Sequence, residues 1–304
     1  MLTEDIARYL ALRQSLGFKI RVPASRLRRF GEWASAHGDA AVRTASAIAW
    51  AAEAPSPAQR RERLVVVRRF ALYMQAEDPR YEVPPARAFG LPVRRRRTPH
   101  IYSPDEISRL LRAAATLTPV HSTRPGTYVA LLSLLFATGL RISEALALQL
   151  DDVTPDGLVV RETKFRKSRL VPLHPTARVG LDHFLARRRR HVTQDPAVFL
   201  SLWQTRLHYA TVLATFLHIA RSAGVRGGSG TAGVRLHDAR HTFAVRALES
   251  CSPDRADISR HVLALSTYLG HAHPSDTYWY LQATPKLLAD IAYAGETTFT
   301  GGGA

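Results

Sequence analysis

Residues 269–281 read LGHAHPSDTYWYL, and this stretch places Tyr280 nine positions after His271. Further upstream, residues 237–241 read HDARH and residues 137–144 read ATGLRISE. Together the three stretches supply two arginines, two histidines and a tyrosine in a fixed order. Each stretch alone is a weak signal, but the ordered set is specific. It predicts one active site assembled from segments that lie far apart in the chain.

Residue types of this kind suit chemistry on a phosphodiester, whose anionic oxygens repel an attacking nucleophile. A catalyst must neutralise the charge that grows on the non-bridging oxygens. Arginine does this well, because its planar guanidinium binds two phosphate oxygens at once and stays charged. A tyrosine hydroxyl becomes a better nucleophile where nearby positive charge favours the phenolate. The pattern therefore predicts attack of a tyrosine on a DNA phosphodiester.

The composition of the chain also points to DNA as its partner. The 304 residues carry a formal net charge of +17, with a pI of about 10.9, which favours polyanions. The length suits two domains, and a hydrophobic content of 46% excludes a disordered chain. Cys251 is the single cysteine, so no intrachain disulfide can form. The N-terminus lacks the basic and apolar regions of a signal peptide, so we expect a cytoplasmic protein.

The first 90 residues show the apolar spacing of a small helical domain. Thr3 is expected to cap the first helix, and the fourth helix should present a core face of Leu64, Val67, Phe70, Ala71 and Met74. Residues 77–100 have no helical period and hold five prolines. We interpret residues 91–100 as a basic linker whose Arg94, Arg95, Arg96 and Arg97 lie along DNA phosphates. The four helices are expected at 3–17, 25–37, 44–53 and 58–76.

Residues 101–304 predict a mostly helical α+β domain with a small antiparallel sheet. Ser103, Pro104 and Glu106 form a helix start with a capping box. Residues 158–173 predict a β-hairpin with its turn at 163–168, and residues 198–200 are expected to add a third strand. Residues 227–230 are expected to form a flexible loop. Helices are expected at 127–138, 142–148, 175–191, 204–223, 238–249, 256–268 and 284–293, ahead of a glycine-rich tail.

The chain resembles the tyrosine recombinases, also called phage-integrase or Xer-like recombinases, most strongly from Arg141 to Tyr280. This resemblance implies a mainly α fold with an N-terminal SAM-like four-helix bundle over residues 1–90 and a catalytic domain over residues 101–304. It also implies a 3′-phosphotyrosyl link, a free 5′-hydroxyl and strand exchange through a Holliday junction. Two protomers would bind one double-stranded DNA site and four would form the synapse, without metal, ATP or another cofactor.

The resemblance implies a role for each matched residue. Arg141 and Arg240 match the two catalytic arginines, and Tyr280 matches the nucleophile. His237 would assist proton transfer or support the phosphate, and His271 would bond a phosphate oxygen.

Several neighbours of the matched residues have implied or competing roles. Lys164 matches the hairpin lysine that protonates the leaving 5′-oxygen, with Lys167 as its rival in the same turn. Tyr278 competes with Tyr280, but on a helix it lies roughly 200° round the axis and is expected to pack. Glu144 would orient Arg141 or the neighbouring hairpin, and His241 would support the site from behind. Backbone phosphate contacts are expected from Arg166, Lys167 and Arg169.

The chain departs from the family pattern in two places. Ala239 stands where leucine is common, and 31 residues separate Arg240 from His271, so that Ser250 to Arg260 looks like an insertion. No cluster of histidine, cysteine or acidic residues has zinc spacing, so we expect no metal.

Two alternative functions stay open: a catalytically silent DNA-binding protein of the same fold, and a type IB topoisomerase. Leu287, Leu288 and Ile291 of helix 284–293 could pack in cis or dock on a neighbouring protomer.

Overall fold

A computed structural model describes residues 1–18, 20–91, 98–161, 168–190, 193–227, 233–250 and 255–270, together with Thr277 and Tyr280. The chain divides into two compact units, Met1–Arg96 and Arg97–Ala304, and the division falls within the segment that we interpret as a linker. Each unit has a hydrophobic core of its own, as a separate domain requires. Among the helices that the structure describes, none has the length and apolarity needed to cross a bilayer.

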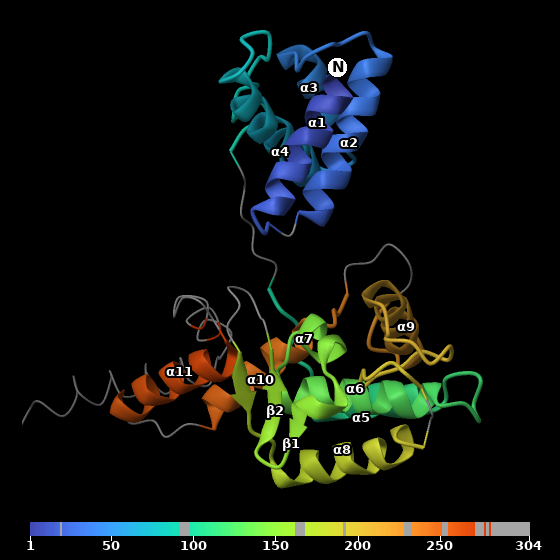
Figure 1. The fold of residues 1–304 in the computed structure, drawn as a ribbon. Helices are drawn as coiled ribbons and strands as arrows, with labels where there is room; N and C mark the ends of the chain where they lie inside the picture. Colours follow the sequence, from blue (N-terminus) through green and yellow to red (C-terminus); the bar gives the residue numbers. More distant parts are fainter. Residues whose placement is uncertain are drawn as a thin grey trace, which may run out of the picture. The chain divides into compact units, whose positions relative to one another are not determined.

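The N-terminal unit is a bundle of four helices (Figure 1). All five residues of the predicted core face of the fourth helix are buried, so that prediction is confirmed. The predicted cap at Thr3 is wrong, because the first helix begins at Leu2 and the Met1 ammonium bonds the Glu4 carboxylate at 2.8 Å. The helices are α1 (Leu2–Ser15), α2 (Arg21–Ala36), α3 (Thr44–Ala52) and α4 (Pro57–Gln75).

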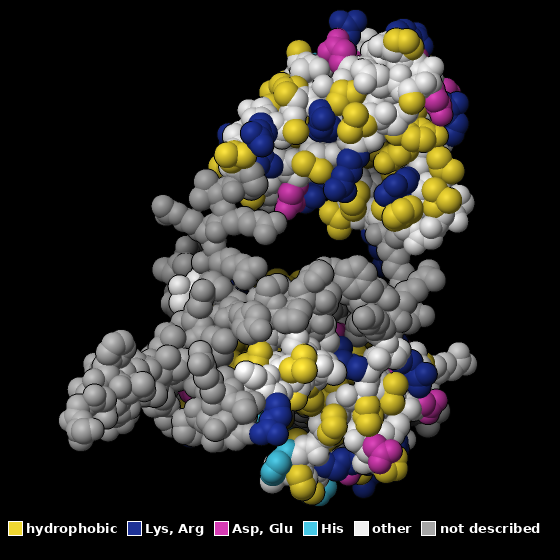
Figure 2. All heavy atoms as spheres, turned by 90° about the vertical axis from the view of Figure 1, so that its left-hand side faces the viewer, with side chains coloured by type: hydrophobic (Ala, Val, Ile, Leu, Met, Phe, Trp, Pro, Cys, Tyr) yellow, Lys and Arg dark blue, Asp and Glu magenta, His cyan; other side chains and the backbone are white. Residues whose placement is uncertain are grey.

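The surface of this unit is rich in basic side chains. In Figure 2, arginine side chains recur over the visible face of the unit, with a few carboxylates among them. Helices α2 and α4 lie side by side and are joined by an ion pair between Arg26 and Glu62 at 2.7 Å. Their exposed arginines add to a surface that attracts polyanions. These arginines are Arg21, Arg28 and Arg29 on α2 and Arg69 on α4.

The C-terminal unit is mostly helical. Its long apolar helix α6 packs against α5, α7, α8 and α10 (Figure 1). The predicted capping box is confirmed, since Ser103 Oγ accepts from the Glu106 backbone at 3.1 Å and Glu106 accepts from the Ser103 backbone at 2.8 Å. The helices are α5 (Pro104–Ala115), α6 (Arg124–Thr138), α7 (Ile142–Ala147), the 3₁₀ helix η1 (Leu150–Asp152), α8 (Pro175–Arg188), α9 (Tyr209–Ser222), α10 (Asp238–Glu249) and α11 (Arg255–Leu269).

The sheet is antiparallel, with the order β1 (Val153–Thr154), β2 (Gly157–Val160) and β3 (Arg169–Val171). The predicted strand at 198–200 is wrong, because β1 occupies that edge of β2. Leu200 instead bridges Arg206 across a tight turn in which Gln204 is left-handed, with φ +57°. That turn also explains why α9 begins at Tyr209 and not at 204. The predicted fold class, mainly helical with a small antiparallel sheet, is confirmed.

Candidate active site

The turn between α6 and α7 sets the geometry of the site. Gly139 ends α6 in a left-handed conformation with φ +61°. A Cβ at this position would lie 2.6 Å from the Phe243 ring of α10, so glycine is required by both conformation and space. Arg141 follows at the start of α7, where its backbone N–H donates to the Glu144 carboxylate at 3.1 Å. The stretch ATGLRISE therefore forms a tight corner that carries Arg141.

Arg240 is the buried arginine of the site, with 2% of its surface exposed. From the first turn of α10, its Nη1 donates to the Gly139 carbonyl at 2.8 Å and its Nη2 to the Leu269 carbonyl at 2.7 Å. Burial and then the Arg141 charge lower the pKa of Arg240 to about 10, while Tyr280 opposes the shift through its charge and a side-chain hydrogen bond. Arg240 therefore stays charged at neutral pH and lies within reach of Tyr280.

Arg141 is more open to solvent, with 31% of its side chain exposed. Its Nη1 donates to Glu144 Oε1 at 2.7 Å, and its Nη2 donates to the Gly270 carbonyl at 3.3 Å. Arg240 holds the preceding carbonyl, that of Leu269. The two guanidinium groups thus bind adjacent carbonyls at the end of α11. Positive charge is concentrated at the backbone that leads into His271.

Glu144 bonds both Arg141 and the neighbouring hairpin, the two partners that the sequence offered as alternatives. Its carboxylate accepts from Arg141, and it also accepts from Arg169 of β3 at 2.8 and 3.2 Å. Burial alone would raise the pKa of Glu144, but the hydrogen bonds and charge of Arg169 and the hydrogen bonds of Arg141 outweigh burial and lower it. Glu144 is therefore an ionised, buried carboxylate shared by two arginines.

Arg169 is engaged by protein atoms on three of its nitrogens. Besides the two bonds to Glu144, its Nε donates to the Tyr268 carbonyl at 2.8 Å. Sequence reasoning missed the Tyr268 carbonyl as a partner, because Tyr268 lies 99 residues further along the chain. Arg169, which we expected to touch DNA phosphate, joins β3 to α7 and α11.

The His241 ring contacts two other aromatic rings, those of His237 and Tyr280. His237 and His241 are one helical turn apart, with ring centroids 4.8 Å apart, and the His241 ring lies 5.3 Å from that of Tyr280. Tyr280 is 3% exposed and packs with α10 and α11 residues. Burial, then the charges of Arg240 and Arg235, lower the pKa of His237; burial and then His237 lower that of His241 to about 4. Both imidazoles are therefore neutral at pH 7.

The structure brings together four predicted catalytic residues, Arg141, His237, Arg240 and Tyr280, with two predicted supporting residues, Glu144 and His241. The structure also describes Arg169, which bonds Glu144 and the Tyr268 carbonyl. The other predicted site residues lie outside the described residues, as do Tyr278, the loop from 228 and the helix 284–293. Those predicted site residues are Arg94, Arg95, Arg96, Arg97, Lys164, Arg166, Lys167 and His271.

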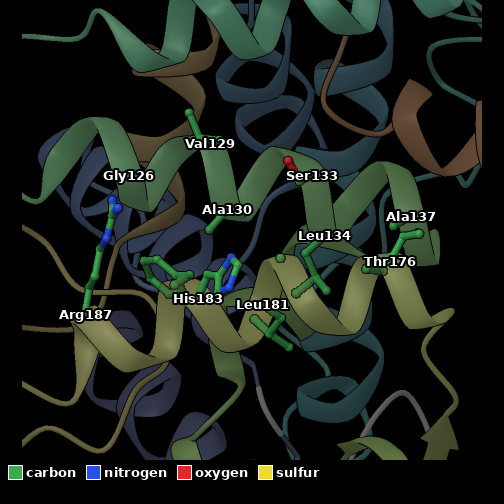
Figure 3. Close-up of a pocket in the computed structure, with 13 residues that line it drawn as sticks. Gly126, Val129, Ala130, Ser133, Leu134, Ala137, Thr176, Leu181, His183 and Arg187 are labelled. Carbon is green, nitrogen blue, oxygen red and sulfur yellow. The ribbon is translucent and has the colours of Figure 1, made fainter.

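A groove of about 390 Å³ lies apart from this site, between α6 and α8 (Figure 3). Val129, Ala130 and Leu134 face it from α6, and Leu181 and His183 face it from α8. No predicted site residue lines the groove, so we do not take it for the active site. Within the described ranges, no three histidine, cysteine or acidic side chains gather as a metal site.

Sequence comparison finds close relatives along most of the chain. The model of the phage integrase family matches residues 101–286. The putative integrase/recombinase y4rB of Sinorhizobium fredii is 40% identical over 300 residues, which cover 94% of each chain. The tyrosine recombinase XerD of Mycobacterium tuberculosis is 33% identical over 233 residues, covering 75% of this chain and 70% of XerD.

Structural comparison agrees at the level of the fold. A lambda integrase tetramer bound to a Holliday junction superposes with a TM-score of 0.66 at 17% identity, covering 92% of this chain and 76% of the integrase. The family match covers the segment in which Arg141, Arg240 and Tyr280 converge. The chain therefore belongs to the phage integrase family and is a site-specific tyrosine recombinase, an enzyme of DNA strand exchange.

Proposed function

We propose that Tyr280 is the nucleophile and that this recombinase cuts and rejoins DNA through a 3′-phosphotyrosyl intermediate and a Holliday junction. The observation that carries the proposal is the meeting of Arg141, Arg240 and Tyr280 at the end of α11. A guanidinium beside the Tyr280 hydroxyl can stabilise the negative charge that passes through its oxygen during attack. Two arginines at one point can also neutralise a phosphate that binds there.

In the proposed step, a bond forms between the Tyr280 oxygen and phosphorus while the bond to the 5′-oxygen breaks. Arg141 and Arg240 neutralise the non-bridging oxygens, and Lys164 gives its proton to the leaving oxygen. The tyrosine proton passes to His237, whose pKa is lowered by burial, so that its neutral imidazole can accept. Attack by a 5′-hydroxyl reverses these changes. Because the phosphotyrosyl bond conserves the energy, religation needs no ATP. Because the two arginines carry the phosphate charge, no metal is needed.

The proposed substrate is a double-stranded recombination site bound by two protomers, with four protomers in the synapse. The similar lambda integrase was solved as a tetramer on a Holliday junction, which supports this assembly. We assign DNA clasping to residues 1–90 and phosphate contacts to Arg94, Arg95, Arg96 and Arg97. The net charge of +17 supports both assignments. A cytoplasmic location stays a prediction.

Paired-site recombination tests the proposal. A supercoiled plasmid carries two copies of the site found by mapping covalent cleavage, and the reaction contains EDTA and no ATP. We expect excised circles and trapped Holliday junctions. Relaxation of a plasmid without sites, and no excision, would indicate a type IB topoisomerase. Binding with neither product would indicate a silent DNA-binding protein.

A further inference from the structure

Arg169 touches two separate parts of the proposed phosphate site. It stands at the start of β3, and 13% of its side chain is exposed. Its two terminal nitrogens face the two oxygens of Glu144, at 3.2 and 2.8 Å, in a fork that fixes direction as well as distance. Its Nε bonds the Tyr268 carbonyl in the last turn of α11. The side chain therefore joins β3 to both α7 and α11.

Glu144 links Arg169 to Arg141, because its carboxylate accepts hydrogen bonds from both. Its Oε1 accepts from Arg141 at 2.7 Å and from Arg169 at 3.2 Å, so the two guanidinium groups share one oxygen. Only 7% of the Glu144 side chain is exposed. A buried carboxylate that loses a donor must find another or accept a proton. Loss of Arg169 would therefore change how Glu144 holds Arg141.

Gly270 shows how closely Arg169 packs on the same backbone. Gly270 is left-handed with φ +66°, and a Cβ there would lie 2.8 Å from Arg169 Nη1. Its carbonyl accepts from Arg141. Arg169 and Arg141 thus hold the backbone of residues 268–270 through different carbonyls. The next residue in the chain is His271.

We propose that Arg169 is a positioning residue of the phosphate site, which fixes Arg141 through Glu144 and fixes the backbone that leads into His271. The inference rests on the proposed function, and it replaces the DNA phosphate contact that we expected of Arg169. Three guanidinium nitrogens of Arg169 donate to protein oxygens, and only 13% of the side chain is exposed, so little of it is open to DNA. Such a residue changes the rate of attack and leaves the affinity for DNA unchanged.

The first test compares Arg169→Met and Arg169→Lys with a matched control, Arg178→Met. Arg178 also bonds a carboxylate, since its Nε donates to both oxygens of Asp182, but it lies on α8 away from the site. We measure covalent adduct formation on a nicked DNA substrate and DNA affinity at several salt concentrations. Arg169→Met should slow adduct formation roughly 10- to 100-fold, as misplaced catalytic groups do. Arg169→Lys should be intermediate, and Arg178→Met should match wild type.

The salt dependence separates a positioning residue from a phosphate contact. We expect the same slope of log affinity against log salt for Arg169→Met and wild type. A slope flatter by about 0.9, with unchanged cleavage, would make Arg169 a phosphate contact and overturn the proposal. Thermal melting checks that Arg169→Met is folded. If it is not, Arg169→Lys carries the same comparison.

The chemistry of the leaving group separates a defect in the phosphate site from the loss of the general acid Lys164. A 5′-bridging phosphorothiolate leaves without a proton, so it should rescue Lys164→Ala and leave Arg169→Met slow. Glu144→Gln added to Arg169→Met should cost less than the sum of the two single effects, since both act through one contact. Full rescue of Arg169→Met, or strictly additive effects, would overturn the proposal. A wild-type protein that forms no adduct would defeat the proposed function instead.

Discussion

The guanidinium of Arg240 donates to the carbonyl of Leu269 at 2.7 Å, although 29 residues separate them. Its other terminal nitrogen reaches Gly139, 101 residues before it. One buried side chain therefore joins the ends of α6 and α11 to α10. Leaving a buried acceptor without its donor costs about 1–3 kcal/mol. Arg240 thus stabilises the domain besides carrying the charge that we assign to catalysis.

Arg240→Lys should keep a positive charge but lose the planar fork. We expect covalent adduct formation to fall by roughly 10²- to 10³-fold, the usual loss for one donor to a developing charge. The free energy of unfolding should fall by about 1–3 kcal/mol, because one carbonyl loses its donor. Single-turnover cleavage and urea denaturation measure the two effects. Arg246→Lys, on the same helix, is the control, and wild-type cleavage by Arg240→Lys would contradict the assignment.

Gly139→Ala should destabilise the protein by about 1–3 kcal/mol, because the new methyl group must occupy a left-handed conformation next to Phe243. Gly126→Ala is the matched control on the same helix. A Cβ at Gly126 meets nothing within 4 Å, so alanine there should be neutral or stabilise by up to about 1 kcal/mol. Denaturant unfolding compares the two. Equal effects would show that the turn does not need glycine.

His241 should make stability depend on pH. Burial, then His237, lowers its pKa to about 4, against about 6.5 in an unfolded chain. The unfolded state therefore binds more protons between these values, and the stabilisation present above pH 6.5 is lost as the pH falls towards 4. His241→Gln should flatten that dependence by up to about 1.4 kcal/mol per pH unit. Unfolding free energies for the variant and for the exposed control His218→Gln measure it; parallel curves for all three proteins would refute it.

Replacing Arg94, Arg95, Arg96 and Arg97 by alanine should weaken binding to every DNA sequence alike. Each lost phosphate contact should flatten the dependence of log affinity on log salt by about 0.9. Gel-shift titration on the recombination site and on unrelated DNA at several salt concentrations gives both quantities. A loss confined to the recombination site, with an unchanged salt slope, would mean that these arginines read sequence.

Features with local causes were predictable from the sequence. The capping box at Ser103 and the core face of α4 depend on residues three or four positions apart, which local periodicity reveals. The pairing of Arg141 with Glu144 is of the same kind, because both belong to one turn. The ordered motifs also predicted which distant residues meet, through the family that they resemble.

Distant contacts that lie outside these motifs were not predictable. Nothing near Arg169 indicates that its partner is the carbonyl of Tyr268, because a backbone acceptor has no sequence signature. The strand predicted at 198–200 was wrong for a similar reason. Residues such as Leu200 are common in strands, but Leu200 closes a tight turn with Arg206. Thr3 is a good cap by type, yet α1 begins before it.

The most direct test of the central claim is to identify the residue that becomes linked to DNA. Wild-type protein, Tyr280→Phe and Tyr278→Phe are each incubated with nicked suicide DNA in excess EDTA without ATP, and the linked peptide is sequenced by mass spectrometry. We predict a 3′-phosphotyrosyl adduct at Tyr280 in the wild type and in Tyr278→Phe. Tyr280→Phe should form none while binding DNA normally. An adduct that persists in Tyr280→Phe, or cleavage that strictly requires magnesium, would contradict the account.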